Sequence, residues 1–133
     1  MSAVFADAFY FVALLNRGDQ YHAKARAVAN QLRGNIITTE WVLIEVADAL
    51  SESASRRLVA PFIRALFQDP KVKVVQAADQ WFQRGLELYG QRPDKDWPLT
   101  DCISFVVTTE EKLTEALTGD RHFEQAGFKA LLS

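Results

Sequence analysis

Short apolar runs alternate with longer segments of helical periodicity, and this alternation limits the fold more than any other feature of the chain. The short runs lie at 3–7 (AVFAD), 35–39 (NIITT), 72–75 (VKVV), 114–120 (TEALTGD) and 128–132 (FKALL). Strands that are separated regularly by helices favour a parallel sheet with helices on both faces. We therefore predict an α/β fold, a three-layer α/β/α sandwich with a central parallel sheet.

The intervening segments read as helices. One of them, over 22–33, is expected to close at Gly34, and another is expected to break or kink at Pro61. Apolar residues at helical spacing are clearest after NIITT, where Val42, Leu43 and Val46 recur on one side. The helices are predicted at 8–15, 22–33, 40–52, 56–69 and 77–90, from Asp101 onward, and at 122–127.

The length, charge and cysteine content of the chain limit the classes of function that it can have. The 133 residues, 49% of them hydrophobic, suffice for a single domain over 1–133. With 15 basic and 17 acidic residues the net charge is -2, so any nucleic-acid contact must be local or metal-assisted. The single Cys102 excludes an intramolecular disulfide and favours a reducing, cytoplasmic location. The longest uncharged apolar run, Ala8 to Leu15, is too short to span a bilayer, so no membrane association is expected.

Four carboxylates are placed where an open parallel sheet binds its ligands, at the carboxyl ends of the strands. Asp7 ends the first apolar run, and Asp120 follows the strand predicted at EALT. Asp101 opens a helix that can face the same crevice. Glu45 lies one turn into the helix after NIITT, within reach of the same edge. We therefore expect the four side chains to converge.

Convergence of four acids is unfavourable without a cation, because like charges a few ångströms apart raise one another's pKa. Hard oxygen ligands, with no cysteine and no histidine cluster, select Mg²⁺ or Mn²⁺ over zinc. Such a site supports phosphodiester hydrolysis, in which metal ions activate a water and neutralise the phosphate. A metal would also bridge an acidic protein and an acidic substrate.

Taken singly, each acid has a purely structural explanation. Asp7 would serve as a helix cap, Asp101 as a helix-start charge and Asp120 as a turn residue. Glu45 shares a helical ridge with Asp48 and would be a solvated carboxylate. Only the joint arrangement of the four points to a site.

Four segments resemble, in order, the successive motifs of PIN-domain nucleases, including the VapC-like toxins of bacterial toxin–antitoxin pairs. They are VFADAFYFVALLNRGDQYH, TTEWVLIEVADAL, DWPLTDCISF and EALTGDRHFEQAGF, and together they span essentially the whole chain. The resemblance places Asp7, Glu45, Asp101 and Asp120 at the family's acidic metal-binding positions. One departure is Gly119, where the family often has a polar residue directly before its last aspartate.

The resemblance implies a PIN-like domain that cleaves single-stranded or structured RNA with Mg²⁺, for which Mn²⁺ can substitute. It further implies a homodimer and, for a toxin, a small antitoxin protein whose C-terminal segment blocks the acidic cleft. A catalytically silent PIN-like module that binds RNA or protein is the alternative from another class. Retention of all four acids argues against that alternative.

Several neighbouring residues allow two interpretations. Thr100 would cap the helix at Asp101, and Asp96 is either an auxiliary carboxylate or, as we favour, an exposed loop charge. His122 could touch a phosphate, although a surface or packing role is the default for it. We expect Trp97 to lie in the core or in an interface rather than to stack on a base, and we expect Cys102 to be a small core side chain.

Two other phosphate-chemistry folds fit poorly. A receiver domain would carry an aspartate after its third strand, where this chain has VVQ. A haloacid-dehalogenase-like phosphatase would need a second aspartate two residues after Asp7, where Phe9 stands. The chain also contains no glycine-rich phosphate loop.

Overall fold

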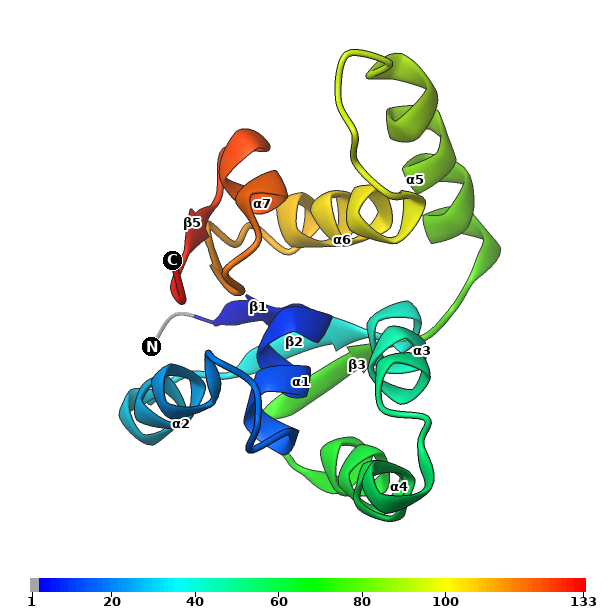
Figure 1. Cartoon of the computed structure of the whole chain (residues 1–133). Coiled ribbons are helices and arrows are strands. Elements are labelled where there is room, and N and C mark those ends of the chain that lie inside the picture. The colour runs from blue at the N-terminus through cyan, green and yellow to red at the C-terminus, as the bar shows by residue number, and fades with distance from the viewer. Residues whose placement is uncertain (1–2) are drawn as a thin grey trace.

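A five-stranded parallel sheet runs through the middle of the molecule in the computed structural model, which describes residues 3–133 (Figure 1). All four strand pairings are parallel, and the order across the sheet is β3-β2-β1-β4-β5. The predicted strands are thus all present. They are β1 (Val4–Ala6), β2 (Ile36–Thr39), β3 (Val72–Val75), β4 (Glu115–Leu117) and β5 (Lys129–Ala130).

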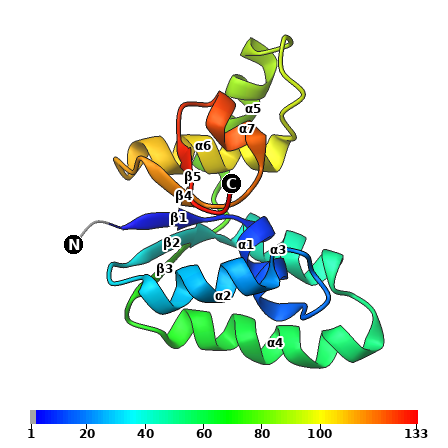
Figure 2. The same ribbon diagram turned by 60° about the vertical axis from the view of Figure 1, so that its left-hand side comes forward.

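Helices cover both faces of the sheet, and the predicted three-layer α/β/α sandwich is confirmed (Figures 1 and 2). Parallel neighbours require such crossovers, because a tight turn cannot return the chain to the same end of the sheet. One face carries α1 (Ala8–Leu15), α2 (His22–Gln31), α3 (Glu40–Ala49) and α4 (Ser53–Gln68), and the other carries α5 (Asp79–Gln91), α6 (Leu99–Glu110) and α7 (Arg121–Gln125).

The strand order reverses next to β1. On one side β1 pairs with β2, with Val4 opposite Ile36, and on the other it pairs with β4, with Phe5 opposite Ala116. Chain connections therefore leave the sheet in opposite directions on the two sides of this junction, and open parallel sheets bind their ligands at the carboxyl ends of the strands at such a point. Asp7 directly follows β1 at this point.

An aromatic cluster packs α7 against β1 and α6. The Phe123 ring is fully buried, with its centroid 6.1 Å from that of Phe5 on β1 and 4.9 Å from that of Phe105 on α6. Truncating such a side chain to alanine costs about 3–5 kcal/mol. This anchor fixes the orientation of a helix that has only five residues.

Close packing between α5 and α6 depends on a glycine. A Cβ built at Gly85 would overlap the side chain of Ile103 and lie 3.0 Å from its Cα. The absence of a side chain at Gly85 therefore lets α5 approach the backbone of α6, the helix that carries Asp101.

No break occurs at Pro61, and the predicted end of the second helix at Gly34 is wrong. The helix α4 continues through Pro61, because Val59 and Leu66, on either side of the proline, are both buried against the core and hold the helix together. The helix α2 ends at Gln31 rather than at Gly34, because Leu32 adopts an extended backbone and packs on the core.

Among residues 3–133, none of the helices combines the length and apolar character that crossing a bilayer requires.

Candidate metal centre

Asp7 is buried at the junction of β1 and α1, with 5% of its surface exposed. It occupies the position before the first residue of α1, but its carboxylate makes no capping hydrogen bond to that helix. Its Oδ2 instead accepts a hydrogen bond of 2.9 Å from the hydroxyl of Thr118, the residue after β4. The helix-cap explanation of Asp7 therefore does not account for its carboxylate.

Asp101 lies in the first turn of α6 and is also buried, with 6% exposed. The helix begins at Leu99, so the residue before it is Pro98 and not Thr100. The prediction that Thr100 caps this helix is wrong, because Thr100 itself belongs to the first turn. A carboxylate in a first turn is favoured by the helix dipole, which gives Asp101 a structural role beside any chemical one.

Asp120 begins α7 from the loop after β4. Its Oδ1 accepts a hydrogen bond of 2.9 Å from the backbone N–H of His122, and its own N–H donates to the Thr118 hydroxyl at 3.1 Å. A Cβ at Gly119 would lie 2.5 Å from Cζ of Phe9. The ring of Phe9 thus occupies the space of a side chain at Gly119, and Thr118 supplies the polar contacts of this loop.

Glu45 is half-buried in the middle of α3, whereas Asp48, one turn on, is exposed. The position of α3 follows from Thr39, which ends β2 and whose hydroxyl accepts a hydrogen bond of 3.1 Å from the Val42 N–H. Such a cap contributes about 1 kcal/mol and fixes where the helix starts. Glu45 and Asp48, which share the ridge considered in the sequence, therefore differ in burial, and the pKa of Glu45 responds to the charges of Asp101 and Asp120.

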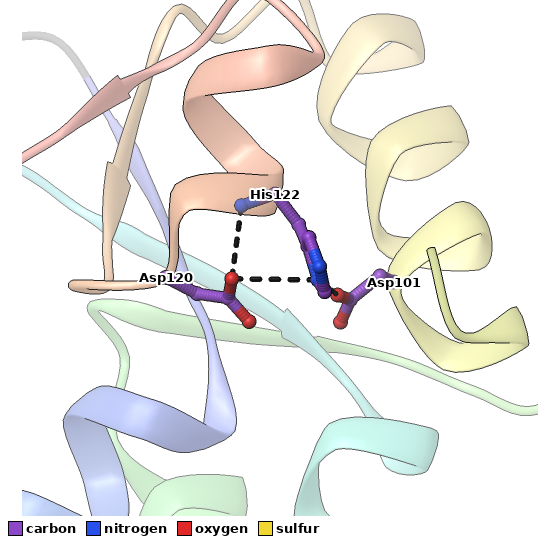
Figure 3. Close-up of side chains that lie close together, drawn as sticks. All are labelled: Asp101, Asp120 and His122. Atoms are coloured by element: carbon purple, nitrogen blue, oxygen red, sulfur yellow. Dashed lines mark hydrogen bonds and ion pairs between the residues drawn. The ribbon is translucent and has the colours of Figure 1, made fainter. Parts of the chain in front are cut away.

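His122 lies between two of the acids, as Figure 3 shows. Its Nδ1 is 3.1 Å from Oδ2 of Asp101 and 3.4 Å from Oδ1 of Asp120. His122, for which a surface or packing role was the default, therefore contacts two of the acids. The available sequence signal was its position two residues after Asp120 and directly before Phe123, which is fully buried.

The carboxylates are electrostatically coupled. The pKa of Asp7 is raised to about 7, chiefly by burial and also by the charges of Asp101 and Glu45, while the hydrogen bond from Thr118 opposes the shift. The pKa of Glu45 is likewise raised to about 7, chiefly by burial and also by repulsion from Asp101, Asp120 and Asp48. For Asp101, burial raises the pKa to about 6, with the hydrogen bond from His122 opposing the shift and the charge of Asp120 adding to it. The four acids thus sense one another across four different elements.

The PIN domain family model matches residues 4–129, nearly the whole chain. The chain belongs to the PIN domain family. Among solved structures it is similar to VapC20 of Mycobacterium tuberculosis, described as a sarcin–ricin loop cleaving toxin, with a TM-score of 0.86, 24% identity and 96% of both chains covered. It is also similar to VapBC2 from Rickettsia felis, bound to a DNA fragment from their promoter, with a TM-score of 0.67, 11% identity and 97% of both chains covered. No curated protein matches it in sequence.

The donor atoms of this PIN domain fit a divalent cation. In the described part of the chain, Asp101, Asp120 and His122 offer ligand atoms that all lie within 4.8 Å of one another. Asp7 and Glu45 lie outside that close group, although their pKa values respond to its charge. Carboxylate oxygens suit hard cations such as Mg²⁺ and Mn²⁺, and a positive charge beside these buried acids would favour their ionised forms.

The other residues considered in the sequence have structural positions. Asp96 is an exposed charge in the loop before α6, as favoured. Trp97 is buried, and its indole N–H donates a hydrogen bond of 2.9 Å to Gln125 on α7, so its position is that of a core residue. Cys102 is fully buried in the core of the PIN domain.

Proposed function

We propose that this PIN domain is a divalent-metal-dependent endoribonuclease that uses Mg²⁺, with Mn²⁺ able to substitute. Asp7, Glu45, Asp101 and Asp120 would hold the metal. The observation that carries the proposal is the electrostatic coupling of four carboxylates from four elements at the point where the strand order reverses. An arrangement that is unfavourable without a cation is the one expected of a metal site.

A divalent cation held by the four acids would supply an activated water and would neutralise the charge of the scissile phosphate. The chain's own residues hold the negative charges that balance the cation. Thr118 keeps the Asp7 carboxylate in place, and the N–H groups of Asp120 and His122 fix the loop after β4. The carboxylate oxygens of the four acids that are not engaged in these hydrogen bonds would hold the metal, and the scissile phosphate of the RNA would bind next to it.

We also propose that the protein is the toxin of a toxin–antitoxin pair and acts in the cytoplasm. The likeness to VapC20 and VapBC2 supports this assignment. Because VapC20 is described as cleaving the sarcin–ricin loop, RNA with that sequence is the first substrate to test. The proposed partner is a small antitoxin whose C-terminal segment covers the acidic cleft. A homodimer is supported by exposed apolar side chains at helical spacing on α5, namely Phe82, Leu86 and Tyr89.

The test is cleavage of sarcin–ricin loop RNA and of unstructured RNA by the purified protein in Mg²⁺, Mn²⁺ or EDTA. Cleavage should require the metal, and Asp101→Asn should abolish it. Asp96→Asn, an exposed aspartate five residues earlier in the sequence, is the matched control and should keep wild-type activity. Cleavage that is insensitive to EDTA would refute the metal requirement.

The same assay separates the nuclease from a catalytically silent module. A silent module would bind RNA or an antitoxin without cleaving any substrate, and Asp101→Asn would leave that binding unchanged. Metal-dependent cleavage by the wild type, lost in Asp101→Asn, excludes this alternative.

A further inference from the structure

His122 contacts two of the acids through two different groups. Its backbone N–H donates to Oδ1 of Asp120 at 2.9 Å, which any residue except proline could do. Its imidazole Nδ1 lies 3.1 Å from Oδ2 of Asp101, a contact that depends on the side chain (Figure 3). The residue therefore connects the first turn of α6 to the start of α7.

The carboxylate of Asp101 needs such a contact. Among residues 3–133, His122 makes the one side-chain hydrogen bond to Asp101, and Asp101 is buried next to other acids. An ionised carboxylate can only accept a hydrogen bond, so the proton of this contact belongs to Nδ1 of His122. The bond fixes both the tautomer of the imidazole and the rotation of the carboxylate.

We infer that His122 is a positioning residue, which sets the orientation of Asp101 relative to Asp120 by donating its Nδ1–H. The inference rests on the proposed metal site, because its consequence is a pair of carboxylates already placed for a divalent cation. Residues that orient metal ligands by hydrogen bonding commonly change metal affinity by about 10- to 100-fold when they are replaced. The role requires a donor at the position of Nδ1 and does not require imidazole.

Two variants of matched shape test this role. His122→Asn places an amide nitrogen one bond from Cγ, where Nδ1 stands, and His122→Leu has the same branched skeleton without a donor. Both keep the backbone N–H that caps Asp120. The control is His22→Asn at the other histidine, whose Nδ1 hydrogen-bonds to the carbonyl of Ala13 at 2.8 Å.

Mn²⁺ affinity measured by isothermal titration calorimetry is the readout, and it is independent of RNA cleavage. We expect His122→Leu to raise the apparent Kd for Mn²⁺ by about 10- to 100-fold, and His122→Asn and His22→Asn to stay within about threefold of wild type. If both His122→Asn and His122→Leu lose the same metal affinity, and the loss is larger for Zn²⁺ than for Mn²⁺, the imidazole is itself a ligand. That result would overturn the inference. An unchanged Kd in His122→Leu would also overturn it.

A second measurement does not depend on the folding of a variant. Nitrogen-15 NMR of the metal-free wild type at pH 8 should show His122 with its proton on Nδ1. The Nε2–H tautomer would overturn the inference even where His122→Leu fails to fold. If the wild type binds no Mn²⁺ by calorimetry, the proposed metal site itself fails, and that result is distinct from equal losses in the two variants.

Discussion

Neutralising Asp7 should stabilise the metal-free protein at high pH. The pKa of this buried carboxyl is raised from 3.8 to about 7, so the folded state binds more protons than the unfolded chain between these values. Stability is then lost as the pH rises through this window. One pKa unit corresponds to about 1.4 kcal/mol, so the raised pKa destabilises the fold by about 4 kcal/mol at pH 8, where the folded-state carboxyl is ionised, and by about 2 kcal/mol at pH 5, where it must take up a proton that the unfolded chain has lost.

Asp7→Asn removes this penalty but introduces a smaller one. The amide oxygen can still accept the hydrogen bond from Thr118, whereas the buried amide N–H₂ has no assigned acceptor and costs about 2 kcal/mol. The variant should therefore be about 2 kcal/mol more stable than wild type at pH 8 and about equal to it at pH 5. For a domain of this size, 2 kcal/mol is about 8 °C in Tm.

The assay is thermal unfolding in EDTA, followed by circular dichroism at pH 5 and pH 8. Asp96→Asn is the control, and because this aspartate is exposed it should change stability by less than about 0.5 kcal/mol at either pH. Mn²⁺ at 100 times its Kd should stabilise the wild type by about 2.7 kcal/mol and Asp7→Asn much less. A variant that is less stable than wild type at pH 8, or a difference that does not depend on pH, would refute the reasoning.

Three further predictions test the site and the surface. Glu45→Gln should lower RNA cleavage at least about tenfold and Asp48→Asn should not, and equal cleavage by both variants would mean that Glu45 does not act at the site. Thr118→Val should weaken Mn²⁺ binding in calorimetry and destabilise the protein by about 1–3 kcal/mol in urea, because it leaves Asp7 without its donor. Thr118→Ser, which keeps the hydroxyl, should restore both properties. Leu86→Glu, at a side chain that is 43% exposed, should convert the proposed dimer to a monomer in analytical ultracentrifugation without lowering Tm.

The sequence predicted the sheet and the edge on which the acids lie, because both depend on features that are local in the chain. Asp7 follows an apolar run directly, and in a parallel sheet the residue after a strand is held at the carboxyl edge. The place of Glu45 could be inferred from the helical spacing of its apolar neighbours Val42 and Val46.

What the sequence could not supply depends on contacts between distant segments. The orientation of His122 follows from the burial of Phe123 between β1 and α6, which no pattern within a five-residue helix reveals. The role of Thr118 likewise depends on a hydrogen bond to Asp7. The continuation of α4 through Pro61 is a case in which packing outweighs a local helix-breaking tendency.

The order of strands in the sheet has a consequence for the chain during translation. The first strand to be made, β1, is the middle strand of the finished sheet, and the hydrogen bond that holds Asp7 comes from a residue 111 positions later. A growing chain therefore carries Asp7 for most of its synthesis without Thr118, whose hydroxyl donates a hydrogen bond to the Asp7 carboxylate. A chain stopped after α6 is expected to show no heat of Mn²⁺ binding in calorimetry, so the proposed metal site would form only after β4 and the loop that follows it have been made.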